Sequence, residues 1–198
     1  DVKFSNGTPM TSEYVVFSIL RAKLPTSDFK EYISSISSVK AIDKYNIGTA
    51  NSFNGGTVFW QMDNTGNIRT GKIMAYDSTT GKRIKDKDII PITWVHSILK
   101  KPKESIRQCL FGLHLLNDNI KQVAIVESEK TAIIMSIESP NYTWMSTGSL
   151  QGFKYEYLAP LKGTAIIAFP DKGGYNNWKE TADILNDKGF SIKFQTIL

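Results

Sequence analysis

Hydrophobic and polar residues follow different periods in the two halves of the 198-residue chain. Near the amino terminus, apolar residues recur at helical spacing over residues 11–24, and a second helix is predicted over residues 27–38, where Ser27 is a suitable amino-terminal cap. We interpret both as packing helices. The following residues, 39–46, are predicted to form a loop that ends at Gly48.

The next segment has the composition of antiparallel strands. Runs of β-branched and aromatic residues at 58–63 and 68–76 flank the turn sequence Asn64-Thr65-Gly66-Asn67, a pattern typical of a β-hairpin. A further turn at Gly81 leads into a short basic strand at residues 82–85. The first half is therefore predicted to be an α+β subdomain with antiparallel strands.

The second half alternates between strand and helix patterns. Strands are predicted at residues 122–126, 142–146, 164–169 and 191–198, and helices at 129–137 and 177–188. This order is typical of an α/β subdomain with a small, mainly parallel sheet and helices on its faces. We place the boundary after Asn117, so that residues 1–117 form the mixed α+β subdomain and residues 118–198 the α/β subdomain.

Charge also differs between the halves. The chain has a formal net charge of +5, and residues 1–117 hold 16 basic and 10 acidic residues, whereas residues 118–198 hold 8 and 9. A basic surface beside a nearly neutral one favours a nucleic-acid partner. Lysine-rich loops that only keep a protein soluble explain such an excess equally well. Charge alone therefore nominates nucleic acid without establishing it.

The content of cysteine and histidine excludes several kinds of site. The single cysteine, Cys109, excludes a disulfide within the chain and a cysteine-cluster zinc site, and fits a reducing cytoplasm. We interpret it as an inert core residue. With only two histidines, the chain also lacks the ligands for a histidine-rich metal site. A metal bound here must be held by carboxylates. No apolar stretch approaches 18 residues, so no membrane-spanning helix is predicted.

Two acidic residues follow two apolar strands. Glu127 comes directly after the first strand, and Asp171 follows the other after Pro170. Because the carboxyl ends of parallel strands lie at one edge of a sheet, we expect the two carboxylates to converge there. Such hard oxygen ligands bind Mg²⁺ or Mn²⁺ together with substrate phosphates. The alternative is that Glu127 caps a helix and Asp171 starts a turn.

The second half resembles a Toprim domain, the metal-binding fold of bacterial DNA primases, topoisomerases and some nucleases. Three motifs carry the resemblance: Glu127-Ser128-Glu129-Lys130-Thr131-Ala132, Ser146-Thr147-Gly148-Ser149 and Asp171-Lys172-Gly173. Two positions depart from the family pattern: Ser128 replaces the usual Gly, and Gly173 stands where the second Asp of an Asp-x-Asp pair is expected. One fewer carboxylate weakens Mg²⁺ binding, and Glu129 is a candidate for the replacement charge.

The first half extends the resemblance to the catalytic core of bacterial DNA primases, over about residues 40–198. In those enzymes a basic, strand-rich subdomain precedes the Toprim fold. The hairpin here likewise passes from an apolar run through Asp63 and Gly66 into a basic strand, and Leu110-Phe111-Gly112-Leu113 resembles the short motif before the Toprim strand. The order of these motifs is more specific than any one of them.

The resemblance implies metal-dependent nucleotidyl transfer for primer synthesis on single-stranded DNA. Glu127 and Asp171 are then catalytic residues and ligands of Mg²⁺ or Mn²⁺. The expected nucleic-acid- and nucleotide-binding residues are Arg69, Lys72, Lys82, Arg83, Lys85, Lys87 and Lys130. Strand alternation places Arg69 and Lys72 on opposite faces, and Lys72 is the better candidate for a binding groove. Lys172 and Tyr175 are weaker candidates for contact with substrate.

The resemblance also implies a setting for the protein. We expect a replication or mobile-element role, a helicase or another replication protein as partner, a cytoplasmic location and no membrane. The chain does not start with Met, and we expect it to be a fragment of a longer protein with an upstream zinc-binding domain. Two alternatives stay open: a Toprim nuclease, and a non-catalytic nucleic-acid-binding module, which the missing second Asp favours.

Overall fold

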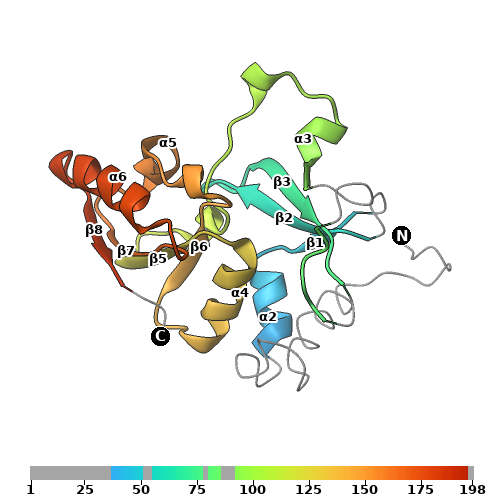
Figure 1. Cartoon of the computed structure of the whole chain (residues 1–198), viewed down its shortest axis with the longest axis horizontal. Helices are drawn as coiled ribbons and strands as arrows, with labels where there is room; N and C mark the ends of the chain where they lie inside the picture. The colour runs from blue at the N-terminus through green and yellow to red at the C-terminus, as the bar shows by residue number, and fades with distance from the viewer. Residues whose placement is uncertain (1–36, 51–54, 78–79, 86–91, 196–198) are drawn as a thin grey trace. The chain divides into compact units, whose positions relative to one another are not determined.

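The computed structural model describes residues 37–50, 55–77, 80–85 and 92–195. The helix predicted at residues 11–24, most of the one at 27–38, Lys87 and the last three residues of the chain lie outside these ranges. The chain divides into two compact units, which we describe separately (Figure 1). The first comprises Asp1–Trp60 and Thr70–Ile106, and the second comprises Gln61–Arg69 and Arg107–Leu198.

The described residues of the first unit are organised around an antiparallel sheet with the strand order β1-β2-β3-β4. In chain order its elements are α2 (Ser37–Lys44), β1 (Gly48–Thr49), β2 (Thr57–Met62), β3 (Ile68–Met74), β4 (Thr93–Trp94), α3 (Val95–Ile98) and the 3-10 turn η1 (Lys103–Ser105). The hairpin predicted around Asn64 and Gly66 joins β2 to β3. The antiparallel α+β prediction is thereby confirmed.

Two local predictions in this unit are wrong. The loop predicted at residues 39–46 is mostly helix α2, in which Ala41 and Ile42 are buried, and Tyr45 is buried directly after it. The basic strand predicted at residues 82–85 is reduced to an isolated bridge between Tyr76 and Arg83.

Trp60 explains two of the glycines in this sheet. A Cβ atom on Gly48 would lie 2.7 Å from the indole Nε1 of Trp60, and a Cβ atom on Gly71 would lie 2.9 Å from its Cε3. The indole therefore covers positions on both neighbouring strands, and it can do so only because those positions carry no side chain.

The second unit contains, within its described residues, a parallel sheet with the strand order β6-β5-β7-β8. The elements are η2 (Leu113–Leu115), β5 (Gln122–Val126), α4 (Glu129–Glu138), β6 (Thr143–Ser146), η3 (Leu150–Gly152), α5 (Tyr155–Leu158), η4 (Ala159–Leu161), β7 (Ala165–Phe169), α6 (Tyr175–Asp187) and β8 (Ser191–Phe194). The predicted order of strands and helices, and the parallel sheet, are confirmed.

Helices cover both faces of this sheet, with α5 and α6 on one side and α4 on the other (Figure 1). On the α6 side, Phe153 stacks on Trp178 with ring centroids 4.3 Å apart inside a continuous apolar core. On the opposite face, Trp144 packs against Phe169 at 5.2 Å. Both sheet faces are thus buried, as the apolar character of β5 and β7 requires.

The second unit starts earlier in the chain than the boundary expected after Asn117. Cys109, Leu110 and Leu113 are buried in its core, and Phe111 forms a bridge with Ser146 at the outer side of β6. These apolar residues pack with the unit that comprises Gln61–Arg69 and Arg107–Leu198. Burial raises the pKa of the Cys109 thiol to about 12, in agreement with an inert core residue.

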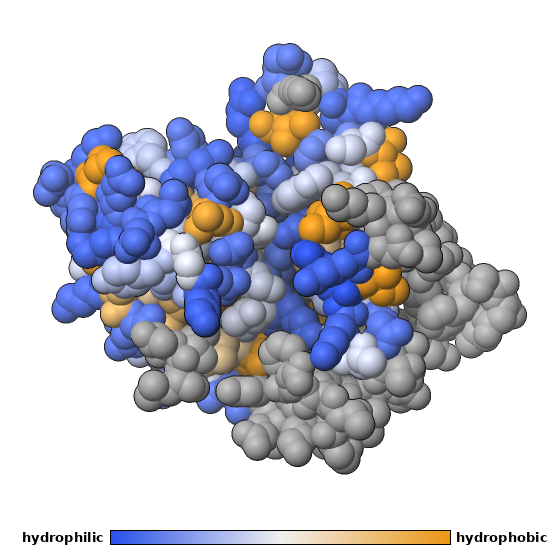
Figure 2. Space-filling model, in the orientation of Figure 1, coloured by the Kyte–Doolittle hydropathy of each residue, from blue (hydrophilic) through white to orange (hydrophobic). Residues whose placement is uncertain are grey.

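Among the described residues, no helix combines the length and the apolar character needed to cross a membrane. On the face drawn in Figure 2, hydrophilic residues predominate and hydrophobic residues occur in small separate groups.

Candidate active site

The strand order identifies one edge of the parallel sheet as the place to look for a site. From β5 the chain passes through α4 to β6 on one side, whereas from β7 it passes through α6 to β8 on the other side. The two connections therefore diverge beyond the carboxyl ends of β5 and β7. In open α/β sheets, ligands bind at such a switch point.

Both predicted acidic residues lie at this switch point. Val126 and Phe169 are register partners on adjacent strands; Glu127 follows the first directly, and Asp171 follows the second after one residue. Adjacent strands lie roughly 4.8 Å apart, so the two carboxylates leave from neighbouring positions at one edge. Glu127 is half-buried and Asp171 is exposed.

The loop after β6 is bound to the end of β5. The backbone N–H groups of Thr147 and Gly148 donate hydrogen bonds to the carbonyls of Val126 and Glu127, at 3.0 and 2.9 Å. A Cβ atom on Gly152 would lie only 2.3 Å from the carbonyl oxygen of Thr147, so the loop can fold this tightly only with glycine there. The Ser146–Ser149 segment, predicted to be a turn, thus fixes the backbone that carries Glu127.

The turn after β7 explains the glycine that replaces the expected second Asp. The N–H of Gly174 donates to the carbonyl of Asp171 at 2.8 Å, which closes a tight turn before α6. Within that turn Gly173 has φ +94°, a conformation that residues with a side chain rarely adopt. An Asp at this position would strain the backbone, so the departure from the Asp-x-Asp pattern follows from the shape of the turn.

Two further charged residues start helix α4 at the same edge. Glu129 is 1% exposed and lies in the first helical turn, where the helix dipole favours a carboxylate. Lys130 is half-buried, and loss of hydration lowers its pKa. Lys130 therefore lies at the start of the helix that follows Glu127, as Lys172 directly follows Asp171.

The other predicted basic residues lie elsewhere. In the first unit, Lys72 is 7% exposed on β3 opposite Trp94 of β4, and three exposed residues follow β3: Lys82, Arg83 and Lys85. Arg69 belongs to the hairpin tip in the second unit, where its Nε donates to Oδ2 of Asp63 at 2.7 Å. Lys72 is thus buried. Arg69 is exposed, and its guanidinium is bound by the carboxylate of Asp63.

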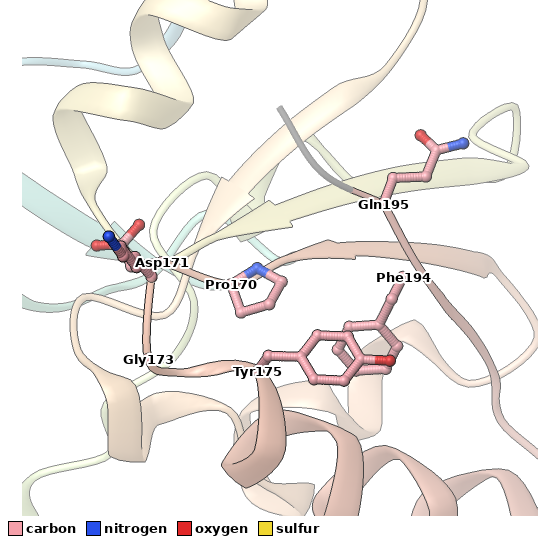
Figure 3. A pocket seen from close by; sticks show the side chains of 7 residues that line it. Pro170, Asp171, Gly173, Tyr175, Phe194 and Gln195 are labelled. Carbon is pink, nitrogen blue, oxygen red and sulfur yellow. The ribbon is translucent and has the colours of Figure 1, made fainter. Parts of the chain in front are cut away.

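A cavity of about 380 Å³ opens beside Asp171 (Figure 3). Its lining residues come from the β7–α6 turn and the end of β8: Pro170, Asp171, Lys172, Gly173, Tyr175, Phe194 and Gln195. Tyr175 meets Phe194 edge to face, with ring centroids 5.2 Å apart. Sequence reasoning included Tyr175 but missed Phe194 and Gln195. The signal for both was their position at the end of another parallel strand.

The strand-end donors suit a hard divalent cation. Within the described ranges, no three His, Cys, Asp or Glu side chains gather closely enough to hold a metal ion by themselves. Mg²⁺ in phosphoryl-transfer sites is held by one or two carboxylates and completes its shell with water and substrate phosphates. Glu127 and Asp171 therefore fit an ion that is shared with a phosphorylated substrate.

Comparison with known proteins gives the fold and the family. No curated protein has a significantly similar sequence. Among solved structures, the primase fragment of the bacteriophage T7 primase-helicase protein is similar, with a TM-score of 0.53 and 18% sequence identity over 80% of this chain. This chain covers only 61% of that fragment. The likeness shows a shared fold.

A family model described as "Domain of unknown function (DUF6371)" matches residues 26–172. The match includes Glu127 and Asp171 and ends within the turn that follows β7. It covers well over half of the chain, and this protein therefore belongs to the DUF6371 family.

Proposed function

We propose that this protein is a primase-like nucleotidyltransferase that extends a primer on single-stranded DNA with a Toprim-like second unit. The observation that carries the proposal is the position of Glu127 and Asp171 on neighbouring strand ends at the switch point of the parallel sheet. The fold shared with a primase fragment supports the same reaction class.

In this reaction the oxygen of a primer 3′-hydroxyl forms a bond to the α-phosphorus of a nucleoside triphosphate. The bond from that phosphorus to its bridging oxygen breaks, pyrophosphate leaves, and the hydroxyl proton passes to water. Glu127 and Asp171 would hold a divalent cation, which would neutralise the phosphate charge. The half-buried ammonium of Lys130 adds positive charge at the same edge. The backbone hydrogen bond from Gly148 holds Glu127 in place.

The first unit supplies basic residues suited to the DNA backbone. Lys82, Arg83 and Lys85 are exposed on one short segment, and such side chains neutralise phosphates without reading sequence. We assign template contact to this segment and not to Lys72, which was the expected groove residue but is buried on β3.

The test is primer synthesis on single-stranded DNA with nucleoside triphosphates and Mg²⁺ or Mn²⁺. We expect Glu127→Gln and Asp171→Asn each to lower incorporation at least about a hundredfold, since even residues that surround metal ligands matter 10–100-fold. Asp183→Asn on the exposed face of α6 is the matched control and leaves incorporation unchanged. Full activity of Glu127→Gln would overturn the proposal, and Mg²⁺-dependent shortening of the DNA would assign the same carboxylates to hydrolysis.

A second candidate is a binding module without catalysis, which the glycine at position 173 favours. Binding of single-stranded DNA that is insensitive both to EDTA and to Glu127→Gln, with no incorporation under any condition, would support it. The two functions are separated by the same pair of proteins, wild type and Glu127→Gln.

A further inference from the structure

We propose that the cavity beside Asp171 binds the base of a nucleotide, with the base stacked on Tyr175. The inference rests on the proposed function for the kind of ligand, a nucleoside triphosphate. It adds a specific base-binding subsite, formed by β8 and the start of α6, to the carboxylate edge.

The aromatic side of the cavity has an exposed ring with a fixed support. Tyr175, the first residue of α6, is 50% exposed. Trp178 on the same helix is fully buried. Phe194 meets the Tyr175 ring at 64° and restricts its movement from behind. A ring held in this way offers a flat apolar surface to a base, and stacking on such surfaces is the usual contact for unpaired bases.

The opposite side of the cavity carries an amide. Figure 3 shows the Gln195 side chain projecting away from the two rings, whereas Pro170 lies between the rings and Asp171. The backbone N–H of Gln195 donates to the carbonyl of Ala168 at 3.1 Å, which fixes the start of that side chain at the sheet edge. An amide can both donate and accept hydrogen bonds, and base edges carry both kinds of group.

The position of the cavity relative to the charged groups gives the ligand a direction. Asp171 and Lys172 line the same cavity as the two rings, on the turn that continues β7. A base on Tyr175 would therefore direct its phosphates toward the ammonium of Lys172 and the strand-end carboxylates. A volume of about 380 Å³ lies in the range of small-molecule sites, which is roughly 300–1,000 Å³.

Tyr155 provides a matched control for this assignment. It is 52% exposed, starts helix α5 and meets Phe190 edge to face at 6.2 Å, but it does not line the cavity. A general effect of removing an exposed tyrosine would appear equally at Tyr155 and Tyr175.

The experiment measures equilibrium binding of ATP and of inorganic tripolyphosphate, in the presence of Mg²⁺ and without DNA, by calorimetry. We expect Tyr175→Ala to weaken ATP binding about tenfold, the size of one lost stacking contact, and to leave tripolyphosphate binding unchanged. Tyr175→Phe retains ATP binding because the ring is kept, and Tyr155→Ala changes neither ligand. Gln195→Ala also weakens ATP binding, by less than Tyr175→Ala.

Two results would overturn the subsite: unchanged ATP binding by Tyr175→Ala, or an equal loss for ATP and tripolyphosphate. These results are separate from a failure of the proposed function. If neither the wild type nor any variant makes primers but ATP binding depends on Tyr175, the subsite is supported and the primase proposal is contradicted. If Tyr175→Ala makes primers with an unchanged KM for ATP, the subsite falls and the primase proposal stands.

Discussion

Asp63 organises the tip of the β2–β3 hairpin through its carboxylate. It accepts hydrogen bonds from the Thr65 hydroxyl at 2.7 Å, from the Thr65 and Asn67 backbone N–H groups at 3.0 and 2.9 Å, and from Arg69 Nε at 2.7 Å. Donors of this kind favour the ionised form, and the Thr65 hydroxyl is the largest cause that holds the pKa of Asp63 below its ordinary value. Ionisation of one residue therefore stabilises a whole turn.

We expect Asp63→Asn to lower Tm at neutral pH, because Asn loses the charge that Thr65 and Arg69 bind. The difference between wild type and variant is fully present above the ordinary aspartate pKa of about 4. It shrinks as the pH falls below that value, because the unfolded state takes up the proton first. Thermal unfolding followed between pH 2.5 and 7 measures this difference.

Asp183→Asn is the control for this experiment. Asp183 pairs with Lys179 on the exposed face of α6, and exposed pairs of this kind contribute little. A pH-independent difference for Asp63→Asn, or one as small as for Asp183→Asn, would contradict the role of Asp63.

At the scale of elements, β3 depends on a glycine in its centre. A Cβ atom on Gly71 would lie 2.8, 2.9 and 3.0 Å from side-chain atoms of Val58, Trp60 and Val95. These contacts come from β2 and from the start of α3, so a side chain here would force the sheet and the helix apart.

Gly71→Ala is therefore expected to destabilise the protein by about 1–3 kcal/mol, the usual cost of overpacking. Val58→Ala removes the closest of the three contacts, so the cost of Gly71→Ala should be smaller in that background. Urea unfolding of the wild type, both single variants and the double variant measures this coupling. If the losses of stability of the two single variants simply add in the double variant, the Val58 side chain is not the source of the steric clash with the new methyl group.

Patterns along the chain predicted the elements that bury a regular face. Strand β5 and the β2–β3 hairpin were predictable, since apolar runs and an Asn-Gly-rich turn are strong local signals. Helix α2 was not, because its eight positions contribute only Ala41 and Ile42 to the buried face, and the third buried residue, Tyr45, follows the helix. The basic segment after Gly81 was wrongly predicted to be a strand: it pairs through a single bridge, and its lysines are disfavoured in strands.

The candidate site was predictable where it follows from a topological rule. Glu127 and Asp171 end apolar strands, and any parallel sheet brings such ends to one edge. Phe194 and Gln195 were not predicted, because their place beside Tyr175 depends on β8 being the neighbour of β7. The order of strands in a sheet cannot be deduced from the local pattern of apolar and polar residues. The positive φ of Gly173 likewise emerges only from the folded turn.

At the scale of the whole molecule, basic charge is concentrated in the first 117 residues, which hold 16 basic and 10 acidic residues. For a protein that binds single-stranded DNA, such charge makes the affinity fall with salt by a slope of roughly −0.7 for each phosphate neutralised. The exposed segment with Lys82 and Lys85 is the part of the described first unit that we assign to this contact.

The double variant Lys82→Glu/Lys85→Glu should bind single-stranded oligothymidine more weakly than wild type at low salt. Its plot of log Kd against log salt should be shallower by about 1.4, the share of two lost phosphate contacts. Fluorescence anisotropy between 50 and 300 mM NaCl measures both. Lys193→Glu on exposed β8 is the control, and a double variant with the wild-type slope would remove this segment from the template contact.

The two outer strands of the parallel sheet differ in their exposure to other chains. Beside β6, Phe111 forms a bridge with Ser146, so part of that edge is already paired. In the described residues β8 has β7 as its only strand partner, and Lys193 is exposed on it, whereas its sequence neighbours Ile192 and Phe194 are buried and half-buried. A second copy adding a strand at β8 would bring lysines together, and such charges oppose edge-to-edge aggregation. We therefore expect Lys193 to disfavour association of two copies along β8.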